Sequence, residues 1–222
     1  MKEHKDTGGD TEVDSTLRPQ SWDEYVGQEK VKENVRLILE AARQRRESPD
    51  HLLLYGQAGL GKTTLAYLIG KETGAHVRPT TGPALEKIGD IAAILSNLSP
   101  YEILFIDEIH RMSRAVEEVF YPALESRKLH LVVGKGPSAK TVSIDLPPFT
   151  VIGATTKASL LSAPLRSRFG GMFRLDYYTL QDIEAIIRRS ARILGVEIAD
   201  LAVQMLAKAS RFTPRTANRL LR

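Results

Sequence analysis

The sequence predicts an α/β fold in which helices cover both faces of a parallel β-sheet, followed by a small helical unit. Between residues 51 and 154, short apolar runs alternate with helical patterns, as in parallel strands joined by crossover helices. From Thr179 onward the pattern is helical, so we place a domain boundary near residues 176–179. The chain has 222 residues, 42% of them hydrophobic, and no cysteine, so its core is predicted to need no disulfides.

The N-terminal region is predicted to hold a disordered leader and then one helix. Residues 1–16 are polar and nearly free of large apolar groups, so they cannot bury enough surface to offset the entropy of ordering. Ser21 and Glu24 have the spacing of a helix capping box. We therefore expect an amphipathic helix after them that ends in the charged stretch 43–47. Its apolar positions recur at helical spacing, at Val31, Val35, Ile38 and Ala42.

The sheet and its helices are predicted from the central part of the chain. A strand over 51–55 precedes a glycine-rich loop and a helix over 62–72, and a second strand follows near 76–79. The later elements are a helix carrying Ile91, Ile94, Leu95 and Leu98, a strand over 103–106, a helix carrying Val116, Val119, Phe120 and Leu124, a strand over 149–154, and helices over 180–194, over 201–210 and from Pro214 onward.

One element interrupts the alternation of strands and helices. Residues 129–133 and 141–146 alternate apolar and polar side chains on either side of the loop 134–137, which predicts a β-hairpin. A hairpin inserted into a core sheet suggests a docking surface for a partner. A purely structural hairpin is equally consistent with the pattern.

Composition excludes several classes of protein. No apolar run approaches the ~20 residues of a membrane span, and the charged N-terminus does not match a secretory signal, so we expect a cytoplasmic protein without a membrane anchor. The five histidines lack metal-ligand spacing, and without cysteine there is no thiolate metal site. The net charge of +4 and the acid-free stretch after Asp200 favour a polyanionic partner, although a solvated basic helix gives the same pattern.

A glycine-rich motif, GQAGLGKT at residues 56–63, follows the first predicted strand and opens a helix. This is the spacing and the structural context of a P-loop. In such a loop, backbone N–H groups and the helix N-terminus hold phosphate oxygens, Lys62 reaches the β- and γ-phosphates, and the Thr63 hydroxyl binds Mg²⁺. We therefore expect ATP and Mg²⁺ to bind at residues 56–64.

Two adjacent carboxylates end the predicted strand 103–106. Asp107 and Glu108 thereby fall at the carboxyl edge of a parallel sheet, where ligands bind in folds of this kind. We expect Asp107 to hold Mg²⁺ through water and Glu108 to polarise the attacking water, which is the arrangement of a Walker B motif. A helix-capping acid would give the same residues without the chemistry.

Phosphoryl transfer also needs a polar sensor and a cation near the γ-phosphate. Thr155 and Thr156 end the predicted strand 149–154 and are candidates for the sensor. Arg166 and Arg168 share one loop, and one of them could act as a finger into a neighbouring subunit. An ordinary strand-end threonine and surface arginines are the alternatives.

Together these motifs resemble those of the RuvB family, the bacterial Holliday-junction branch-migration motors of the AAA+ superfamily. The resemblance implies a hexameric ATPase ring that translocates duplex DNA in recombination and DNA repair, together with RuvA and RuvC. It also implies a large ATPase domain over 17–177 and a helical lid from 178. The segments that carry it are LRPQSWDEYVGQ at 17–28, GLGKTT at 59–64, LFIDEIHR at 104–111, IGATT at 152–156, RFG at 168–170 and TPRTANRLL at 213–221.

The resemblance assigns roles to residues at matching positions. It makes Thr156 the first sensor, Arg168 the finger that reaches a neighbour's ATP, and Arg215 the second sensor on the lid, and the hairpin Leu129–Leu146 becomes the RuvA-docking surface. Catalytic roles fall to Glu108, Thr156 and Arg168, and Mg²⁺ binding falls to Thr63 and Asp107. The implied nucleotide-binding set is Leu17, Arg18, Gly59, Gly61, Lys62, Thr63, Thr64, Glu125, Arg168, Tyr178 and Arg215.

Several positions depart from the family's usual pattern. Gln57 and Ala58 stand where two prolines are common, Ser126 and Arg127 stand where an acid and an aromatic are usual, and Phe212 replaces a glycine. The sequence ends at Arg222, inside the implied lid over 178–222. The family's C-terminal winged-helix DNA-binding domain is therefore expected to be missing, and we interpret the chain as a fragment.

Two other functions are consistent with the motifs. A clamp-loader-like or initiator-like AAA+ switch would use the bound nucleotide to govern assembly, with turnover incidental. A fragment that binds ATP without turning it over is the third interpretation. Glu108 beside Asp107 favours turnover, and the inserted hairpin with Ile109-His110-Arg111 favours the branch-migration family.

Overall fold

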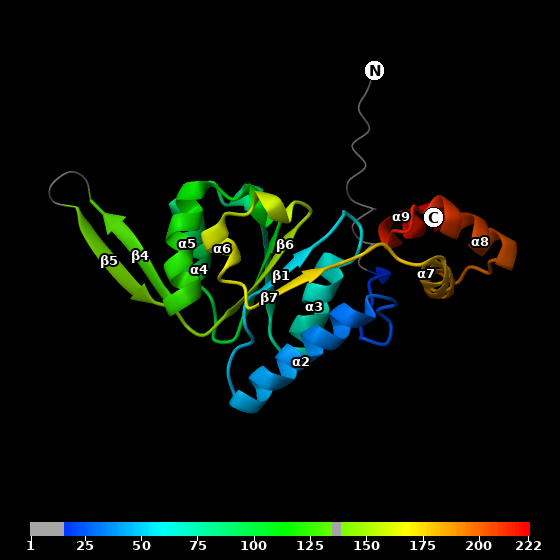
Figure 1. The fold of residues 1–222 in the computed structure, drawn as a ribbon, viewed down its shortest axis with the longest axis horizontal. Helices are drawn as coiled ribbons and strands as arrows, with labels where there is room; N and C mark the ends of the chain where they lie inside the picture. The colour runs from blue at the N-terminus through cyan, green and yellow to red at the C-terminus, as the bar shows by residue number, and fades with distance from the viewer. Residues whose placement is uncertain (1–15, 135–138) are drawn as a thin grey trace, which may run out of the picture.

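The structure, a computed structural model, describes residues 16–134 and 139–222 and has an α/β domain followed by three helices. A two-stranded hairpin projects from one end of the molecule, and the three C-terminal helices lie at the other end (Figure 1). Most of the expected leader over 1–16 and most of the expected hairpin loop over 134–137 lie outside the described residues. The predicted α/β class is confirmed.

Within the described residues, five parallel strands form the central sheet, in the order β2-β3-β6-β1-β7. β6 is buried along its whole length, which explains why residues 151–154 within it form a continuous apolar run rather than an alternating pattern. Tyr55 pairs with Thr155, so the loops that follow β1 and β6 leave the same edge of the sheet. The strands are β1 (Leu52–Tyr55), β2 (Val77–Thr81), β3 (Ile103–Asp107), β6 (Thr150–Thr155) and β7 (Gly171–Arg174).

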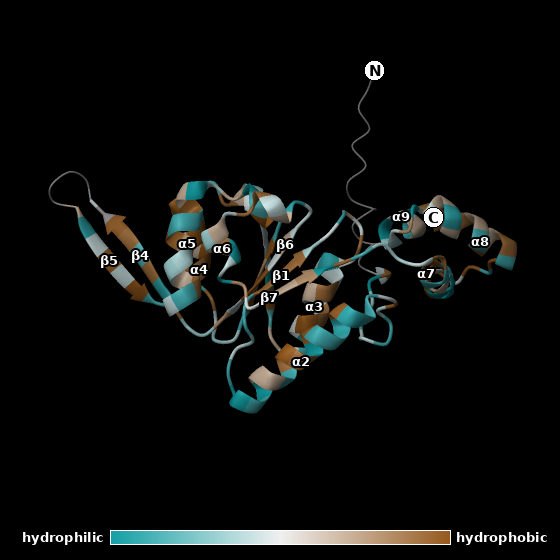
Figure 2. Cartoon of the chain, viewed as in Figure 1, coloured by the Kyte–Doolittle hydropathy of each residue, from teal (hydrophilic) through white to brown (hydrophobic). Residues whose placement is uncertain are grey.

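Helices cover both faces of this sheet. Alternate side chains of a strand point to opposite faces, and Leu52 and Leu54 accordingly pack in one apolar cluster with α2 and α3, whereas Leu53 packs in another with α4 and α5. α2 shows hydrophilic surface and α3 is largely hydrophobic (Figure 2). No helix in the described ranges is apolar and long enough to cross a bilayer. The helices are α2 (Glu29–Arg45), α3 (Lys62–Thr73), α4 (Ile88–Ser96), α5 (Arg114–Ser126) and α6 (Ala163–Arg166).

One prediction about the start of the N-terminal helix is wrong. Ser21 and Glu24 do not cap a helix but lie in a turn, where the Glu24 carboxylate accepts a hydrogen bond from the Gln20 N–H at 2.8 Å. α2 begins instead at Glu29, after the left-handed Gln28, because this turn separates the two segments. Val31, Val35 and Leu39 are buried in the core cluster, and Ile38 is partly buried against it.

Strand β7 was not predicted from the sequence. Its residues Gly171–Arg174 alternate between half-buried and exposed, because the strand lies at the edge of the sheet and, in the part of the chain that the structure describes, pairs only with β1. An apolar run of the kind that marks the central strands is therefore absent from this segment.

The hairpin consists of β4 (Lys128–Val133) and β5 (Lys140–Asp145), which pair in antiparallel fashion. Leu129 is fully buried in the apolar cluster of α5, and Leu131 and Ile144 pack partly against the same cluster. Val132 and Val142 are exposed over 72% and 44% of their surface. The base of the hairpin is therefore fixed to the domain, while apolar side chains toward its tip face solvent.

The C-terminal helices form a lid over the edge of the α/β domain. They are α7 (Leu180–Ile193), α8 (Asp200–Ala209) and α9 (Pro214–Leu221). Thr179 caps α7 in a capping box with Asp182. Ile187 of α7 belongs to the same apolar cluster as Leu60 of the α/β domain. The lid is therefore packed against the domain rather than tethered by a free linker.

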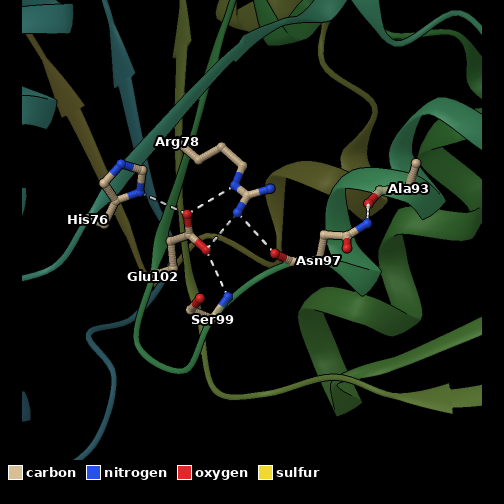
Figure 3. Close-up of polar contacts among 6 residues, drawn as sticks. All are labelled: His76, Arg78, Ala93, Asn97, Ser99 and Glu102. Carbon is tan, nitrogen blue, oxygen red and sulfur yellow. Dashed lines mark hydrogen bonds and ion pairs between the residues drawn. The ribbon is translucent and has the colours of Figure 1, made fainter.

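A buried carboxylate connects several elements at the amino-terminal ends of the strands (Figure 3). Glu102 precedes β3, and its side chain is 2% exposed. It accepts hydrogen bonds from the Ser99 N–H at 2.8 Å, from Arg78 Nε at 3.0 Å and from His76 Nδ1 at 2.9 Å, drawn as dashed lines in Figure 3. Arg78 also donates to the carbonyl of Asn97 at the end of α4. This cluster joins β2, β3 and α4 at the end of the strands remote from the glycine-rich loop.

Candidate nucleotide-binding site

A cavity of about 300 Å³ opens at the carboxyl edge of the sheet, between the glycine-rich loop and the lid. This is the edge at which ligands bind in open α/β sheets. Its lining includes most of the residues predicted from the sequence, namely Leu17, Arg18, Gly59, Gly61, Lys62, Thr63, Thr64, Asp107, Glu108, Thr156, Tyr178 and Arg215.

The glycine-rich loop needs its glycines for two separate reasons. Gly59 and Gly61 have φ values of 81° and 94°, a backbone conformation that residues other than glycine rarely adopt. A Cβ on Gly61 would lie 2.8 Å from the Tyr25 hydroxyl, and one on Gly59 would lie 3.0 Å from Cβ of Arg215. The loop thus turns tightly while the N-terminal segment and the lid both approach its backbone.

Lys62 is held against the loop that it follows. Its Nζ donates hydrogen bonds to the carbonyl oxygens of Gly56 at 2.9 Å and Gln57 at 2.8 Å. Burial lowers the pKa of Lys62 from its ordinary value, and the opposing attraction of Asp107 only partly compensates. The ammonium group is therefore desolvated and close to the cavity, so an anion placed there would be strongly favoured.

The carboxylates of Asp107 and Glu108 both border the cavity but differ in surroundings. An oxygen of Asp107 accepts the N–H of Glu108 at 2.9 Å, which fixes the Asp107 side chain at the strand end. Glu108 has the left-handed φ of 48°, and Arg111 NH1 donates to its carboxylate at 2.9 Å. That hydrogen bond, from within the same short helical turn, is the main cause that lowers the pKa of Glu108 below its ordinary value.

Two adjacent threonines at the end of β6 have different environments. Thr155 is completely buried, and its hydroxyl lies 2.8 Å from Nδ1 of His110 and accepts the N–H of Lys157 at 2.9 Å. Thr156 is partly exposed and lines the cavity. Thr156 is thus the threonine placed to contact a ligand, while Thr155 connects the loop after β3 with the end of β6.

Two buried tyrosines close the side of the cavity formed by the N-terminal segment. The Tyr178 hydroxyl donates to the carbonyl of Leu60 at 3.1 Å, and the Tyr25 hydroxyl lies 3.5 Å from the carbonyl of Gly61. Burial raises the pKa of Tyr178 to about 12, so this group stays a neutral donor. The segment before Tyr25 is anchored as well, because Arg189 of the lid donates to the carbonyl of Leu17 at 2.8 Å.

The first turn of α9 brings Arg215 to the cavity. Arg211 and Phe212 both have left-handed φ values, 52° and 57°, and this unusual pair of residues turns the chain into α9. The Arg215 N–H lies 3.5 Å from the carbonyl of Gly59. The position where a glycine was expected is therefore a genuine left-handed position, occupied by Phe212.

Two predicted residues, Glu125 and Arg168, are absent from the lining of this cavity. They pair with each other instead, because Arg168 NH2 lies 2.8 Å from an oxygen of Glu125. Most of the predicted site residues therefore surround the chain's own cavity, whereas Glu125 and Arg168 lie elsewhere on its surface.

Sequence reasoning missed several residues of the cavity. Glu24, Arg189 and Asn218 line it together with the predicted residues, and Arg189 NH2 pairs with the Glu24 carboxylate at 2.7 Å. A helical pattern alone does not indicate which polar residue of the lid faces the loop. The contact depends on how α7 packs on the N-terminal segment, which no local pattern encodes.

Comparison with known proteins assigns both parts of the chain. A family model described as the Holliday junction DNA helicase RuvB P-loop domain matches residues 17–175, and one described as the RuvB AAA lid domain matches residues 178–222.

Solved structures agree with these matches. The RuvB Holliday junction branch migration motor of Thermotoga maritima has a TM-score of 0.84 and 50% identity, covering 93% of this chain and 64% of that one. An arginine-to-alanine variant of the same protein gives a TM-score of 0.83 and 50% identity, with coverage of 92% and 64%. The chain thus spans 64% of the length of these relatives. From its P-loop, its cavity and these matches, we conclude that the chain belongs to the RuvB family.

Proposed function

We propose that this chain is the ATPase part of a DNA motor that drives branch migration at Holliday junctions. The observation that carries the proposal is one cavity that brings together the desolvated Lys62, the paired acids Asp107 and Glu108, and Arg215 from the lid. Phosphate binding, water activation and a lid contact are thereby available in one place. Family membership adds the DNA substrate, since the matched T. maritima protein is described as a branch migration motor.

The residues suggest a division of labour in ATP hydrolysis. The N–H groups of the glycine-rich loop and Lys62 hold the phosphates, and Lys62 exchanges the carbonyl oxygens of Gly56 and Gln57 for phosphate oxygens. Glu108 orients the attacking water, and Thr156 contacts the γ-phosphate. Arg215 reports the state of the nucleotide to the lid, because its backbone already lies against the loop at Gly59.

The donor set fits Mg²⁺. Thr63 and Asp107 both border the cavity, and the described residues contain no cluster of three or more acids and histidines able to form a complete metal cage. Mg²⁺ in nucleotide sites is held by one or two protein oxygens, by water and by substrate phosphates, which this pair can provide. When bound, the ion neutralises charge on the phosphates. The fixed Asp107 carboxylate would be held ready for it by the Glu108 N–H.

We further propose the assembly and partners that the family implies. The chain acts in a homohexameric ring in the cytoplasm, with RuvA docking on the hairpin Leu129–Leu146 and RuvC acting at the same junction. Two features support this. Arg168 and Glu125 lie outside the chain's own cavity, as expected of groups that serve a neighbour, and Val132 and Val142 leave exposed apolar surface on the hairpin.

The test compares two kinds of stimulation. ATPase activity is measured with RuvA and a four-way junction, and separately with a sliding clamp on primed DNA, using Lys62→Ala as the control for background hydrolysis. Stimulation by RuvA and the junction alone supports the branch-migration motor. Stimulation by the clamp alone would favour the clamp-loader-like switch, and equal rates for the parent and Lys62→Ala would refute the ATP site itself.

A further inference from the structure

Arg168 is held in a fixed position by three neighbours. Its NH1 donates to the carbonyl of Pro164 at 2.7 Å, and its NH2 pairs with Glu125 at 2.8 Å. Its guanidinium carbon lies 5.0 Å from the centre of the Tyr121 ring, which is cation–π distance. The side chain is 25% exposed, so much of this long, flexible group is packed rather than free in solvent.

Tyr121 is itself locked by a buried carboxylate. Its hydroxyl donates to Glu117 at 2.8 Å and lies 2.9 Å from the hydroxyl of Ser162. Ser162 also donates to Glu117, at 2.6 Å, and caps α6 by accepting the N–H of Leu165. Glu117 is only 7% exposed. The network joins α5, which carries Tyr121, to α6, which leads into Arg168.

We propose that Tyr121 is a positioning residue for Arg168, and that its ring holds the guanidinium in the orientation in which it reaches a neighbouring subunit's ATP. The proposal rests on the function proposed above. Stacking on a ring and a hydrogen bond to Pro164 fix the plane of the guanidinium, and Glu125 fixes its rotation within that plane. These two hydrogen bonds use two of the five N–H donors of the arginine, and Nε is buried without a partner among the described residues, so the second N–H groups of NH1 and NH2 are the donors left for a phosphate.

Positioning matters here because an arginine finger works by geometry. A finger stabilises charge on the phosphoryl group only when its N–H groups are already aimed at it, and a loosely held arginine must first be ordered. Tyr121 reduces the ordering that Arg168 still needs before it can act, and it does so without touching the nucleotide. Its loss should therefore reduce turnover and leave ATP affinity unchanged.

The test uses three single variants of the full chain. Tyr121→Leu keeps apolar bulk but removes the ring, and we expect kcat to fall about 3- to 30-fold, the range expected from loss of one cation–π contact, at unchanged KM. Tyr121→Phe keeps the ring and should retain most of the activity. Tyr101→Leu makes the same chemical change at an exposed tyrosine and should have no effect.

Two further measurements separate positioning from a merely structural role. Mixed with Lys62→Ala subunits, Tyr121→Leu should regain activity, because an intact P-loop from one variant then meets an intact Arg168 and Tyr121 from the other. In addition, Tyr121→Leu combined with Arg168→Ala should be no slower than Arg168→Ala alone. A loss of ATP affinity, a failure to recover on mixing or an additive loss in the double variant would overturn the proposal.

The variant Arg168→Ala separates a failure of this inference from a failure of the proposed function. If Arg168→Ala loses turnover while Tyr121→Leu matches the parent, the positioning role is wrong and the finger stands. If Arg168→Ala hydrolyses ATP at the parent rate, the finger itself is wrong, and the role of Tyr121 is rejected with it.

Discussion

The carboxylate of Glu108 lies 2.9 Å from the guanidinium of Arg111, so the acid expected to activate water is already ion-paired within its own helical turn. Glu108→Gln keeps the shape of the side chain but removes the charge that orients water. We expect this variant to bind ATP and to lose hydrolysis. Nucleotide binding and single-turnover hydrolysis, measured side by side, check both parts.

The control for this prediction is Glu118→Gln, which makes the same change at an exposed glutamate of α5 and should keep full activity. Glu108 and Arg111 are both partly exposed, so loss of their ion pair should not measurably change stability. Parent-rate hydrolysis by Glu108→Gln, where chemistry limits turnover, would remove Glu108 from the mechanism.

Glu102 makes stability depend on pH. Burial alone would raise its pKa, but the hydrogen bonds from Ser99, Arg78 and His76 outweigh it and lower the pKa below its ordinary value. A group with a depressed pKa in the folded state stabilises the fold above its unfolded pKa, near 4.5, and loses that contribution as pH falls through the folded value. Glu102→Gln should therefore cost about 1–3 kcal/mol at pH 7.

The measurement is the free energy of unfolding by urea between pH 7 and pH 3. The parent should lose its advantage over Glu102→Gln progressively as the pH falls from about 4.5 toward the lowered pKa of Glu102 in the folded state, where this carboxylate becomes protonated. Glu86→Gln, at an exposed position, serves as the control. A constant difference between the parent and Glu102→Gln over this range would show that Glu102 does not carry the acid dependence.

Local patterns predicted the elements that we propose to bind phosphate, because each is encoded over a few residues. The apolar run of β1, the glycines after it and Lys62 at the start of α3 lie within one short stretch. Asp107 and Glu108 end a buried strand, so their place at the sheet edge follows from the run before them. These are the parts of the fold in which sequence and local structure coincide.

Features that depend on tertiary packing were not predictable in the same way. Strand β7 is recognisable only through its pairing with β1, and the Ser21–Glu24 spacing indicated a helix where the chain forms a turn. Arg189 reaches Leu17 across 172 positions of sequence, a contact with no local signal. Phe212 is the converse case, because the place where the family usually has a glycine is a left-handed backbone position in the structure.

Substitutions at exposed and at buried positions of the hairpin should have different effects, the first on partner binding and the second on stability. The structure packs Leu131 partly against the core, and it places Val132 and Val142 in solvent. Val132→Ser with Val142→Ser should therefore weaken RuvA binding with little effect on stability. Leu129→Ala removes a fully buried side chain and should cost about 2–5 kcal/mol.

A pull-down with RuvA and thermal unfolding of the same samples check this prediction. His130→Ala, also exposed on the hairpin, reports whether any change in this element disturbs binding. Full RuvA binding by the folded variant that carries both Val132→Ser and Val142→Ser would show that these two side chains are not part of the docking surface.

Arg168 should act on the ATP of a neighbouring subunit rather than on its own. It is absent from the lining of its own cavity, and Glu125, Pro164 and Tyr121 hold it elsewhere on the surface. Arginine fingers contribute about 10³–10⁵ in turnover, roughly 4–7 kcal/mol, far more than a surface ion pair supplies. Arg168→Ala should accordingly bind ATP but lose hydrolysis.

The decisive experiment mixes inactive Arg168→Ala with inactive Lys62→Ala. At an interface between the two variants, the intact P-loop of the Arg168→Ala subunit can meet the intact Arg168 of the Lys62→Ala subunit. Activity should therefore reappear on mixing and should vary with the mixing ratio, reaching its maximum where mixed interfaces are most frequent. Arg166→Ala, at the last residue of α6 and two positions before Arg168, is the matched control and should stay active alone. An active Arg168→Ala would make this arginine a surface residue, and an inactive mixture of subunits that do assemble would confine its action to its own chain.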